Sequence, residues 1–131
     1  MSAFVDTSAL YALLDRDDEH HEAAAALFPE LLESEDLITH SYAVVESAAL
    51  VQRRLGSAAL RALFEDLLPV ITVVFVGESL HRAAASALLA AVRRRVSFVD
   101  WVSFELMRSE SLEVAFAFDD DFRTQGFAVR P

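Results

Sequence analysis

Short apolar segments alternate with longer amphipathic segments along the chain, and this alternation restricts the possible folds more than any other feature. Apolar runs bounded by turn residues predict strands at 2–5, 37–39, 70–76, 114–118 and 127–129. The intervening segments predict helices at 7–14, 17–33, 41–56, 57–68, 78–92 and 100–109. Segment 70–76 is β-branched and almost wholly apolar, which is typical of a strand buried on both faces of a parallel sheet. The alternation therefore predicts an α/β protein, a three-layer α/β/α domain with a mainly parallel central sheet.

Length and composition predict one domain over residues 1–131. A chain of 131 residues has the size of one ordinary domain, and 54% hydrophobic residues are enough to build a sizeable core. Only 3 glycines and 3 prolines interrupt the chain, which favours a helix-rich domain with short connections.

The cysteine count and the N-terminus bear on the compartment. The sequence has no cysteine, so disulfides and thiolate metal sites are excluded, and a metal ion would need oxygen ligands or one of the 4 histidines. The N-terminal segment has no basic region, and the longest apolar stretch, 67–76, is too short to span a bilayer. We therefore expect a soluble, cytoplasmic protein without a membrane partner.

The formal net charge of -10 is unusual for a protein that binds nucleic acid, because phosphate contacts normally need a basic surface. Either nucleic acid is not the partner, or much of the negative charge is gathered in a pocket that metal ions neutralise. The one dense basic cluster is Arg93-Arg94-Arg95, which is suited either to an RNA backbone or to a solvated helix end.

Three aspartates follow apolar runs. Asp6 comes after segment 2–5, Asp119 after 114–118, and Asp100 after the short run 98–99. The carboxyl ends of parallel strands meet at one edge of a sheet, where α/β proteins bind their ligands, so these side chains are predicted to converge there.

Glu46 lies between Val44-Val45 and Ala48-Ala49, on a helix predicted to be mostly buried. A buried carboxylate is unfavourable unless it is paired or bound to metal, and four converging carboxylates repel one another strongly. Hard oxygen ligands favour Mg²⁺ or Mn²⁺.

Each acid also has an ordinary explanation. An aspartate after a strand often caps the next helix, and Glu46 could pair with Arg53 or Arg54. The same residue type at three strand ends favours the metal site. Ser41 is predicted to cap the helix that carries Glu46, and a structural role is predicted for His40 beside it.

Four segments resemble the motifs of PIN domains, in the same order and spacing. Residues 4–10 (FVDTSAL) resemble the opening motif, and 42–50 (YAVVESAAL) the second motif with its helical glutamate. Residues 96–104 (VSFVDWVSF) resemble the third motif and 115–122 (AFAFDDDF) the fourth, with Gly126-Phe127 at the usual ending. The family often has asparagine where this chain has Ser41, and serine can also cap and form hydrogen bonds.

Chain length and segment 104–108 are most similar to the toxins of VapBC-type toxin–antitoxin pairs. The resemblance implies a Mg²⁺- or Mn²⁺-dependent endoribonuclease, an RNA substrate, a cognate antitoxin that inhibits it, and a homodimer. It also implies a set of catalytic and metal-binding residues: Asp6, Glu46, Asp100 and Asp119, with Asp121 as an additional metal ligand. Asp120 is expected to point away, and Thr7 or Ser8 to orient Asp6 or contact phosphate. A metal-activated water would then cleave the phosphodiester.

Two other functions remain open at this point. A metal-dependent phosphatase can also carry an acid after its first strand, but the haloacid-dehalogenase type expects a second aspartate where this chain has Ser8. A catalytically inactive PIN-like binding scaffold is the second alternative, and the complete set of acids argues against it. The sequence does not specify which RNA is cleaved.

Overall fold

The computed structural model describes residues 1–91 and 95–131 and contains a five-stranded sheet in the order β3-β2-β1-β4-β5. The strands are β1 (Ser2–Val5), β2 (Asp36–His40), β3 (Thr72–Val74), β4 (Val114–Phe116) and β5 (Ala128–Arg130). Each pair of neighbouring strands is parallel, so the predicted parallel α/β fold is confirmed.

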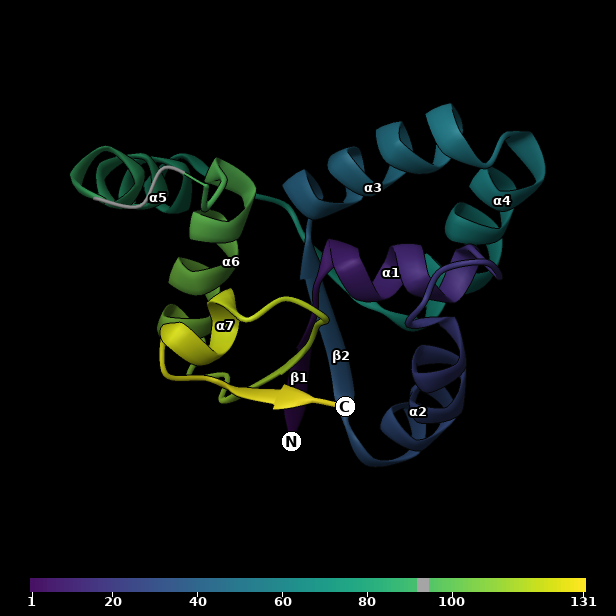
Figure 1. Cartoon of the computed structure of the whole chain (residues 1–131). Coiled ribbons are helices and arrows are strands. Elements are labelled where there is room, and N and C mark those ends of the chain that lie inside the picture. Colours follow the sequence, from purple (N-terminus) through teal and green to yellow (C-terminus); the bar gives the residue numbers. More distant parts are fainter. Residues whose placement is uncertain (92–94) are drawn as a thin grey trace.

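Helices cover both faces of the sheet (Figure 1). On one side lie α1 (Thr7–Leu14), α2 (His21–Ser34), α3 (Ser41–Arg54) and α4 (Ser57–Ala62). On the other lie α5 (Glu78–Ala90), α6 (Phe98–Ser109) and the short α7 (Asp121–Thr124). A π-helical turn (Leu63–Leu67) and a 3-10 turn (Leu68–Val70) connect α4 to β3, where the sequence predicted a continuous helix to residue 68.

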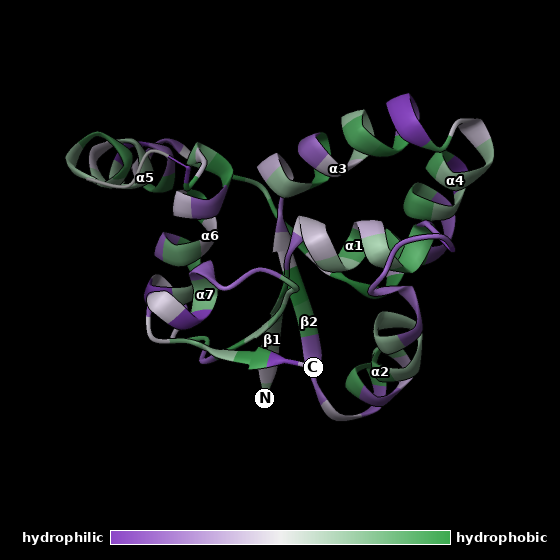
Figure 2. Cartoon of the chain, viewed as in Figure 1, coloured by the Kyte–Doolittle hydropathy of each residue, from purple (hydrophilic) through white to green (hydrophobic). Residues whose placement is uncertain are grey.

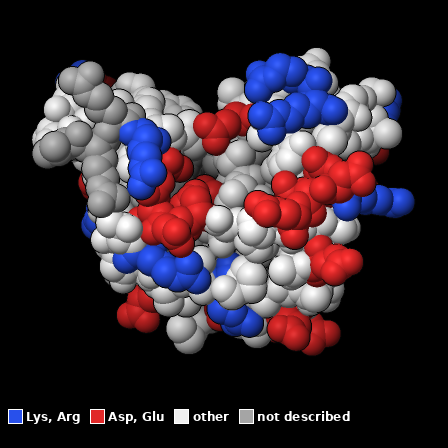
Figure 3. Space-filling view, in the orientation of Figure 1, with Lys and Arg blue, Asp and Glu red and all other residues white. Residues whose placement is uncertain are grey.

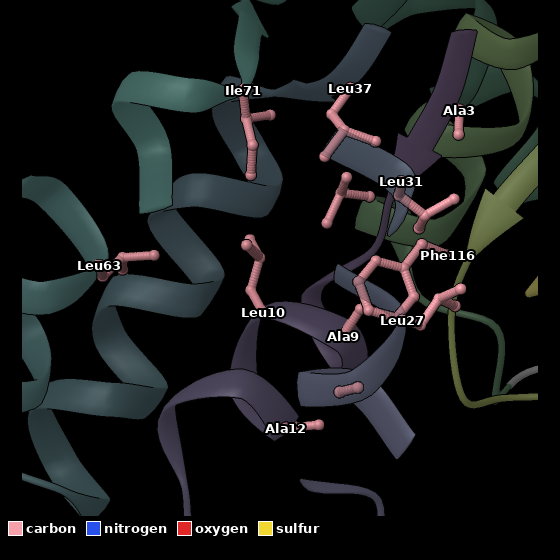
Figure 4. Close-up of a cluster of buried hydrophobic side chains, with 12 residues drawn as sticks. Ala3, Ala9, Leu10, Ala12, Leu27, Leu31, Leu37, Leu63, Ile71 and Phe116 are labelled. Carbon is pink, nitrogen blue, oxygen red and sulfur yellow. The ribbon is translucent and has the colours of Figure 1, made fainter. Parts of the chain in front are cut away.

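Alternation of side chains along the strands divides the core into two clusters. Ala3 and Val5 of β1 point into the cluster beneath α1 and α2, which is drawn in Figure 4, whereas Phe4 points into the cluster beneath α6. In β4, Phe116 joins the first cluster and Ala115 the second. A strand that packs on both faces therefore carries apolar residues at successive positions, as Ala3, Phe4 and Val5 do in β1, and Figure 2 shows a hydrophobic stretch in the middle of β2.

The prediction for segment 70–76 was wrong in extent and burial. Only Thr72–Val74 forms a strand, and β3 is an edge strand that pairs with β2. Val70 is 49% exposed and Phe75 is 81% exposed. Pro69 lies in the 3-10 turn that precedes Ile71, which shortens the strand at its start. An apolar run shows strand propensity but not whether the strand lies at the centre or the edge of the sheet.

Helix α2 begins at His21, four positions later than predicted, because aspartates hold a turn before it. Asp15 accepts a hydrogen bond from the backbone N–H of Asp17 at 3.0 Å, and Asp18 accepts one from the N–H of His20 at 3.0 Å. Such local bonds compete with helix formation.

The strand order fixes where a ligand site is expected. The chain leaves β1 toward β2 on one side and leaves β4 toward β5 on the other, although β1 and β4 are neighbours. The connections diverge beyond the carboxyl ends of these two strands, which is where open α/β sheets have their binding crevice. None of the helices in residues 1–91 and 95–131 is long and apolar enough to cross a membrane.

Replacing Phe4 by alanine is expected to lower the free energy of unfolding by about 3–5 kcal/mol, because the ring is fully buried beneath α6. Replacing the exposed Phe75 by alanine is the matched control and should change it by less than about 0.5 kcal/mol. Urea unfolding of both variants measures the difference. Equal losses would contradict the assignment of Phe4 to the core.

Candidate metal centre

Three carboxylates meet beyond the ends of β1 and β4. Asp6, Asp100 and Asp119 each offer one carboxylate oxygen, and these oxygens all lie within 4.8 Å of one another. Asp6 is 3% exposed, and the other two are half-buried. The structure thus brings together three of the acids that the sequence indicated.

Asp6 is both a helix cap and a member of this cluster. Its Oδ2 accepts hydrogen bonds from the backbone N–H of Ser8 at 3.1 Å and from the Ser8 hydroxyl at 2.6 Å. The Ser8 hydroxyl oxygen in turn accepts from the N–H of Phe118 at 3.0 Å. Ser8 therefore orients Asp6 and connects the end of β1 to the segment that carries Asp119. Asp6 thus caps α1 and belongs to the carboxylate cluster at the same time, so the two explanations that the sequence offered for it do not exclude each other.

Asp100 reaches the cluster from a helix, not from the end of a strand as predicted. Residues 98 and 99 open α6, and Ser97 is its N-cap. The N–H of Asp100 donates to the Ser97 hydroxyl oxygen at 3.1 Å, and the N–H of Ser97 donates to Asp100 Oδ2 at 3.3 Å. The run 98–99 is too short for a strand, and the pattern Ser-x-x-Asp before an apolar segment is a capping box that the sequence already contained.

Asp119 lies in the turn between β4 and α7. Its Oδ1 accepts a hydrogen bond from the N–H of Asp121 at 3.1 Å. The Asp120 side chain is 93% exposed and pairs with Arg123 at 3.2 Å, so it points away from the cluster as expected. Asp121 is half-buried and close enough to Asp119 for its charge to raise the pKa of Asp119, but it is not one of the three converging acids.

Glu46 lies near the cluster but outside the group of three. The buried residues of α3 are Ala43, Ser47 and Val51, and Val45 is 68% exposed. The expectation of a mostly buried helix was therefore wrong for Val45 and Ala49, which are exposed, whereas Val44 and Ala48 are half-buried. Glu46 is half-buried at the rim. Glu46 and Val99, the residue before Asp100, line the same pocket. After burial and the charge of Asp119, the charge of Glu46 also raises the pKa of Asp100.

The sequence also allowed Glu46 to form an ion pair with Arg53 or Arg54. In the described part of the chain, no ion pair joins Glu46 to either arginine. Arg54 lies instead over the ring of Tyr11, 5.7 Å from its centroid. Of the predicted basic cluster, residues 93 and 94 lie outside the described residues, and Arg95 is exposed.

The cluster is electrostatically strained. Burial, followed by the charge of Asp119, raises the pKa of Asp6 from 3.8 to about 7, although the hydrogen bond from Ser8 opposes this rise. Burial, again followed by the charge of Asp119, raises the pKa of Asp100 from 3.8 to about 6. Burial also raises the pKa of Asp119. A cation among these groups would favour their charged forms.

The donor set fits a divalent ion that prefers oxygen. Oxygen ligands of one Mg²⁺ ion lie at most about 4.2 Å apart, since each is about 2.1 Å from the metal. Oxygens within 4.8 Å of one another reach this geometry with small side-chain movements. Figure 3 shows acidic side chains on both sides of a hollow between the α3 side and the α6 side of the molecule.

The chain matches the PIN domain family over residues 3–128. This chain is a PIN domain. The four motifs that resembled the family are thus confirmed as a family relationship.

Two relatives of this PIN domain are the 23S rRNA-specific endonucleases VapC20 of two Mycobacterium tuberculosis strains. Each is 36% identical over 130 residues, which cover 98% of both chains. A crystal structure of M. tuberculosis VapC20, described as a sarcin-ricin loop cleaving toxin, superposes with a TM-score of 0.88 at 35% identity. It covers 99% of this chain and 100% of that one.

The PIN fold extends to more distant structures. FitAcB of Neisseria gonorrhoeae has a TM-score of 0.71 at 18% identity and covers 98% of this chain and 96% of its own. FitAB bound to an IR36 DNA fragment has a TM-score of 0.72 at 18% identity, with coverage of 97% and 92%. At this identity the likeness concerns the fold alone.

Replacing Asp6 by asparagine is expected to stabilise this PIN domain in the absence of metal. The folded state holds the Asp6 proton up to about pH 7, whereas the unfolded state releases it near 3.8, so the wild type loses stability as pH rises between these values. Asparagine keeps an oxygen for Ser8 without the charge. The melting temperature at pH 7.5 should rise by on the order of 5 °C. If Asp6→Asn melts at a lower temperature than wild type at pH 7.5 in EDTA, the charged form of Asp6 is not unfavourable in the folded protein and this explanation is contradicted.

The affinity for Mn²⁺ is expected to rise with pH. Asp6 and Asp100, with pKa values of about 7 and about 6, must lose their protons when metal binds. The apparent affinity should fall roughly tenfold per pH unit below pH 7 and more steeply below pH 6. Calorimetric titration between pH 5.5 and 8, with circular dichroism to confirm folding, measures this dependence. A constant affinity over the range would exclude these carboxylates as ligands.

Proposed function

We propose that this PIN domain is a Mg²⁺- or Mn²⁺-dependent endoribonuclease that hydrolyses RNA phosphodiester bonds as the toxin of a toxin–antitoxin pair. The observation that carries the proposal is the convergence of Asp6, Asp100 and Asp119 beyond the ends of β1 and β4. The 36% identity to a 23S rRNA-specific endonuclease over nearly the full length of both chains supports it.

In this proposal Asp6, Asp100 and Asp119 hold the metal ion, and Glu46 at the rim completes the set of metal-binding and catalytic acids. Asp121 contributes a further carboxylate next to Asp119. The bound metal supplies an activated water near neutral pH and neutralises charge on the phosphate. Ser8 keeps the Asp6 carboxylate aimed at the cluster through two hydrogen bonds, and the capping box with Ser97 does the same for Asp100.

The relatives suggest which RNA to test first. VapC20 is described as specific for 23S rRNA and as cleaving the sarcin-ricin loop. We propose a loop of ribosomal RNA as the substrate of this chain as well. With a net charge of -10, the surface gives little general attraction for RNA, which favours recognition of one shaped target over binding to any RNA.

We also propose a cognate antitoxin and a homodimer as partners. The acidic hollow suits an antitoxin segment rich in arginine, because a guanidinium group can form charge-assisted hydrogen bonds with carboxylates that a metal ion would otherwise occupy. An antitoxin of this kind would inhibit cleavage by competing with metal at the cluster.

Replacing Asp100 by asparagine is expected to reduce RNA cleavage to background while the protein stays folded, because it removes one of the three converging carboxylates. Asp66→Asn is the matched control, since Asp66 is exposed in the turn after α4, and it should cleave like wild type. The assay uses intact 23S rRNA and a mixed RNA pool, with Mg²⁺, Mn²⁺ or EDTA. Full activity of Asp100→Asn, or cleavage in EDTA, would contradict the proposed mechanism.

If neither the wild type nor the control cleaves RNA, and both proteins are confirmed free of bound antitoxin, that result would contradict the nuclease function itself. Metal binding under those conditions would then favour the inactive scaffold. Hydrolysis of a generic phosphomonoester would favour the phosphatase.

A further inference from the structure

His40 is a buried histidine that the proposed function does not use. It ends β2, is 0% exposed, and caps α3 in place of the predicted Ser41. Ser41 has a different partner, because its hydroxyl oxygen accepts from the N–H of Val76 at 3.0 Å. A fully buried imidazole needs hydrogen-bond partners for both ring nitrogens.

The partners of His40 determine which nitrogen carries the proton. The backbone N–H of Ala43 donates to Nδ1 at 3.1 Å, so Nδ1 is unprotonated. Nε2 therefore carries the proton and donates to the hydroxyl oxygen of Ser103 at 2.8 Å. The Ser103 hydroxyl donates onward to the carbonyl oxygen of Val99 at 3.0 Å. The chain of bonds runs from α3 through His40 to α6 with each donor satisfied.

These bonds join the segments that carry the acids. His40 caps α3, and this helix carries Glu46, which lies at the rim of the carboxylate cluster. On α6, Val99 precedes Asp100, and Ser103 lies about one turn after it. The imidazole also stacks on Phe4 of β1, with ring centroids 5.6 Å apart, two residues before Asp6. One buried side chain thus contacts the elements that present Asp6, Glu46 and Asp100.

The hydrogen bond from His40 to α6 has no second copy among the described residues, and another contact between the first turns of α3 and α6 is the packing of Tyr42 against Phe98, with ring centroids 5.9 Å apart. Within residues 1–91 and 95–131, no other side-chain hydrogen bond joins residues 40–54 to α6. The Tyr42 hydroxyl instead bonds to His81 of α5 at 2.6 Å. The relative position of the first turns of α3 and α6 therefore depends on packing and on the bond between His40 and Ser103.

We propose that His40 is a positioning residue that, through Ser103, fixes Glu46 relative to the Asp6–Asp100–Asp119 cluster and so sets the affinity of this chain for divalent metal. The proposal rests on the proposed function for the identity of the metal ligands, but it does not depend on RNA cleavage. Residues that hold ligands in place commonly contribute about 10- to 100-fold to metal affinity without touching the ion.

The test measures Mn²⁺ affinity of the metal-free protein at pH 7.5 by calorimetry. His40→Asn keeps a favourable N-cap for α3 but is too short to reach Ser103. Ser103→Ala removes the other partner and is the smaller change. Each variant should bind Mn²⁺ about 10- to 100-fold more weakly, and the double variant should be about as weak as either single one, since all three lack the same bond.

Leu63→Ala is the control for a loss of stability alone. Leu63 is fully buried in the π-helical turn and belongs to the core cluster on the opposite side of the sheet from α6. It should lower the melting temperature and leave the Mn²⁺ affinity unchanged. Wild-type affinity in folded Ser103→Ala and His40→Asn would overturn the proposal, as would an equal loss of affinity in Leu63→Ala.

The two proposals fail in different ways. If wild type binds Mn²⁺, both variants bind it more weakly and no protein cleaves RNA, then the positioning role stands and the nuclease function is wrong. If wild type cleaves RNA while both variants keep full affinity for Mn²⁺, then the positioning role is wrong. Absence of Mn²⁺ binding by wild type would overturn the positioning role.

Discussion

Mutual repulsion among three carboxylates at the ends of β1 and β4 is the constraint on which the rest of the site depends. The oxygens of Asp6, Asp100 and Asp119 lie within 4.8 Å of one another, and burial removes the water that would otherwise screen them. The fold keeps them there because each belongs to a local motif that the backbone needs. Asp6 caps α1, Asp100 completes a capping box on α6, and Asp119 holds the turn into α7. A divalent cation bound among the three carboxylates would turn this repulsion into binding energy.

The same three residues therefore affect stability in opposite directions. As caps, the acids stabilise helices by satisfying free N–H groups. As a cluster, they destabilise the metal-free protein at neutral pH, because the raised pKa values of Asp6 and Asp100 show that their charged forms are disfavoured in the folded state. Strain of this kind is concentrated at functional sites. Folding is supported elsewhere, by the two apolar clusters that enclose the sheet.

Much of this arrangement could be predicted from the sequence. Alternating segments indicated the parallel sheet, and aspartates after apolar runs indicated Asp6 and Asp119. Three features were not predicted in this way. Sheet order is a property of long-range pairing, so segment 70–76 did not reveal that β3 lies at an edge. Asp100 was attributed to a strand end, although its capping box with Ser97 was visible. The burial of α3 follows Ala43, Ser47 and Val51, and small residues give a weak pattern beside Val44 and Val45.

The central claim is that this cluster is a divalent metal site, and a crystal structure of the protein grown with Mn²⁺ tests it most directly. Anomalous scattering at the manganese edge locates the ion without reference to any assumed ligand. The account predicts a peak bonded to carboxylate oxygens of Asp6, Asp100 and Asp119, with ligand distances close to those of a hard, oxygen-bound cation. A peak elsewhere on the molecule, or none at saturating Mn²⁺ and neutral pH, would contradict it.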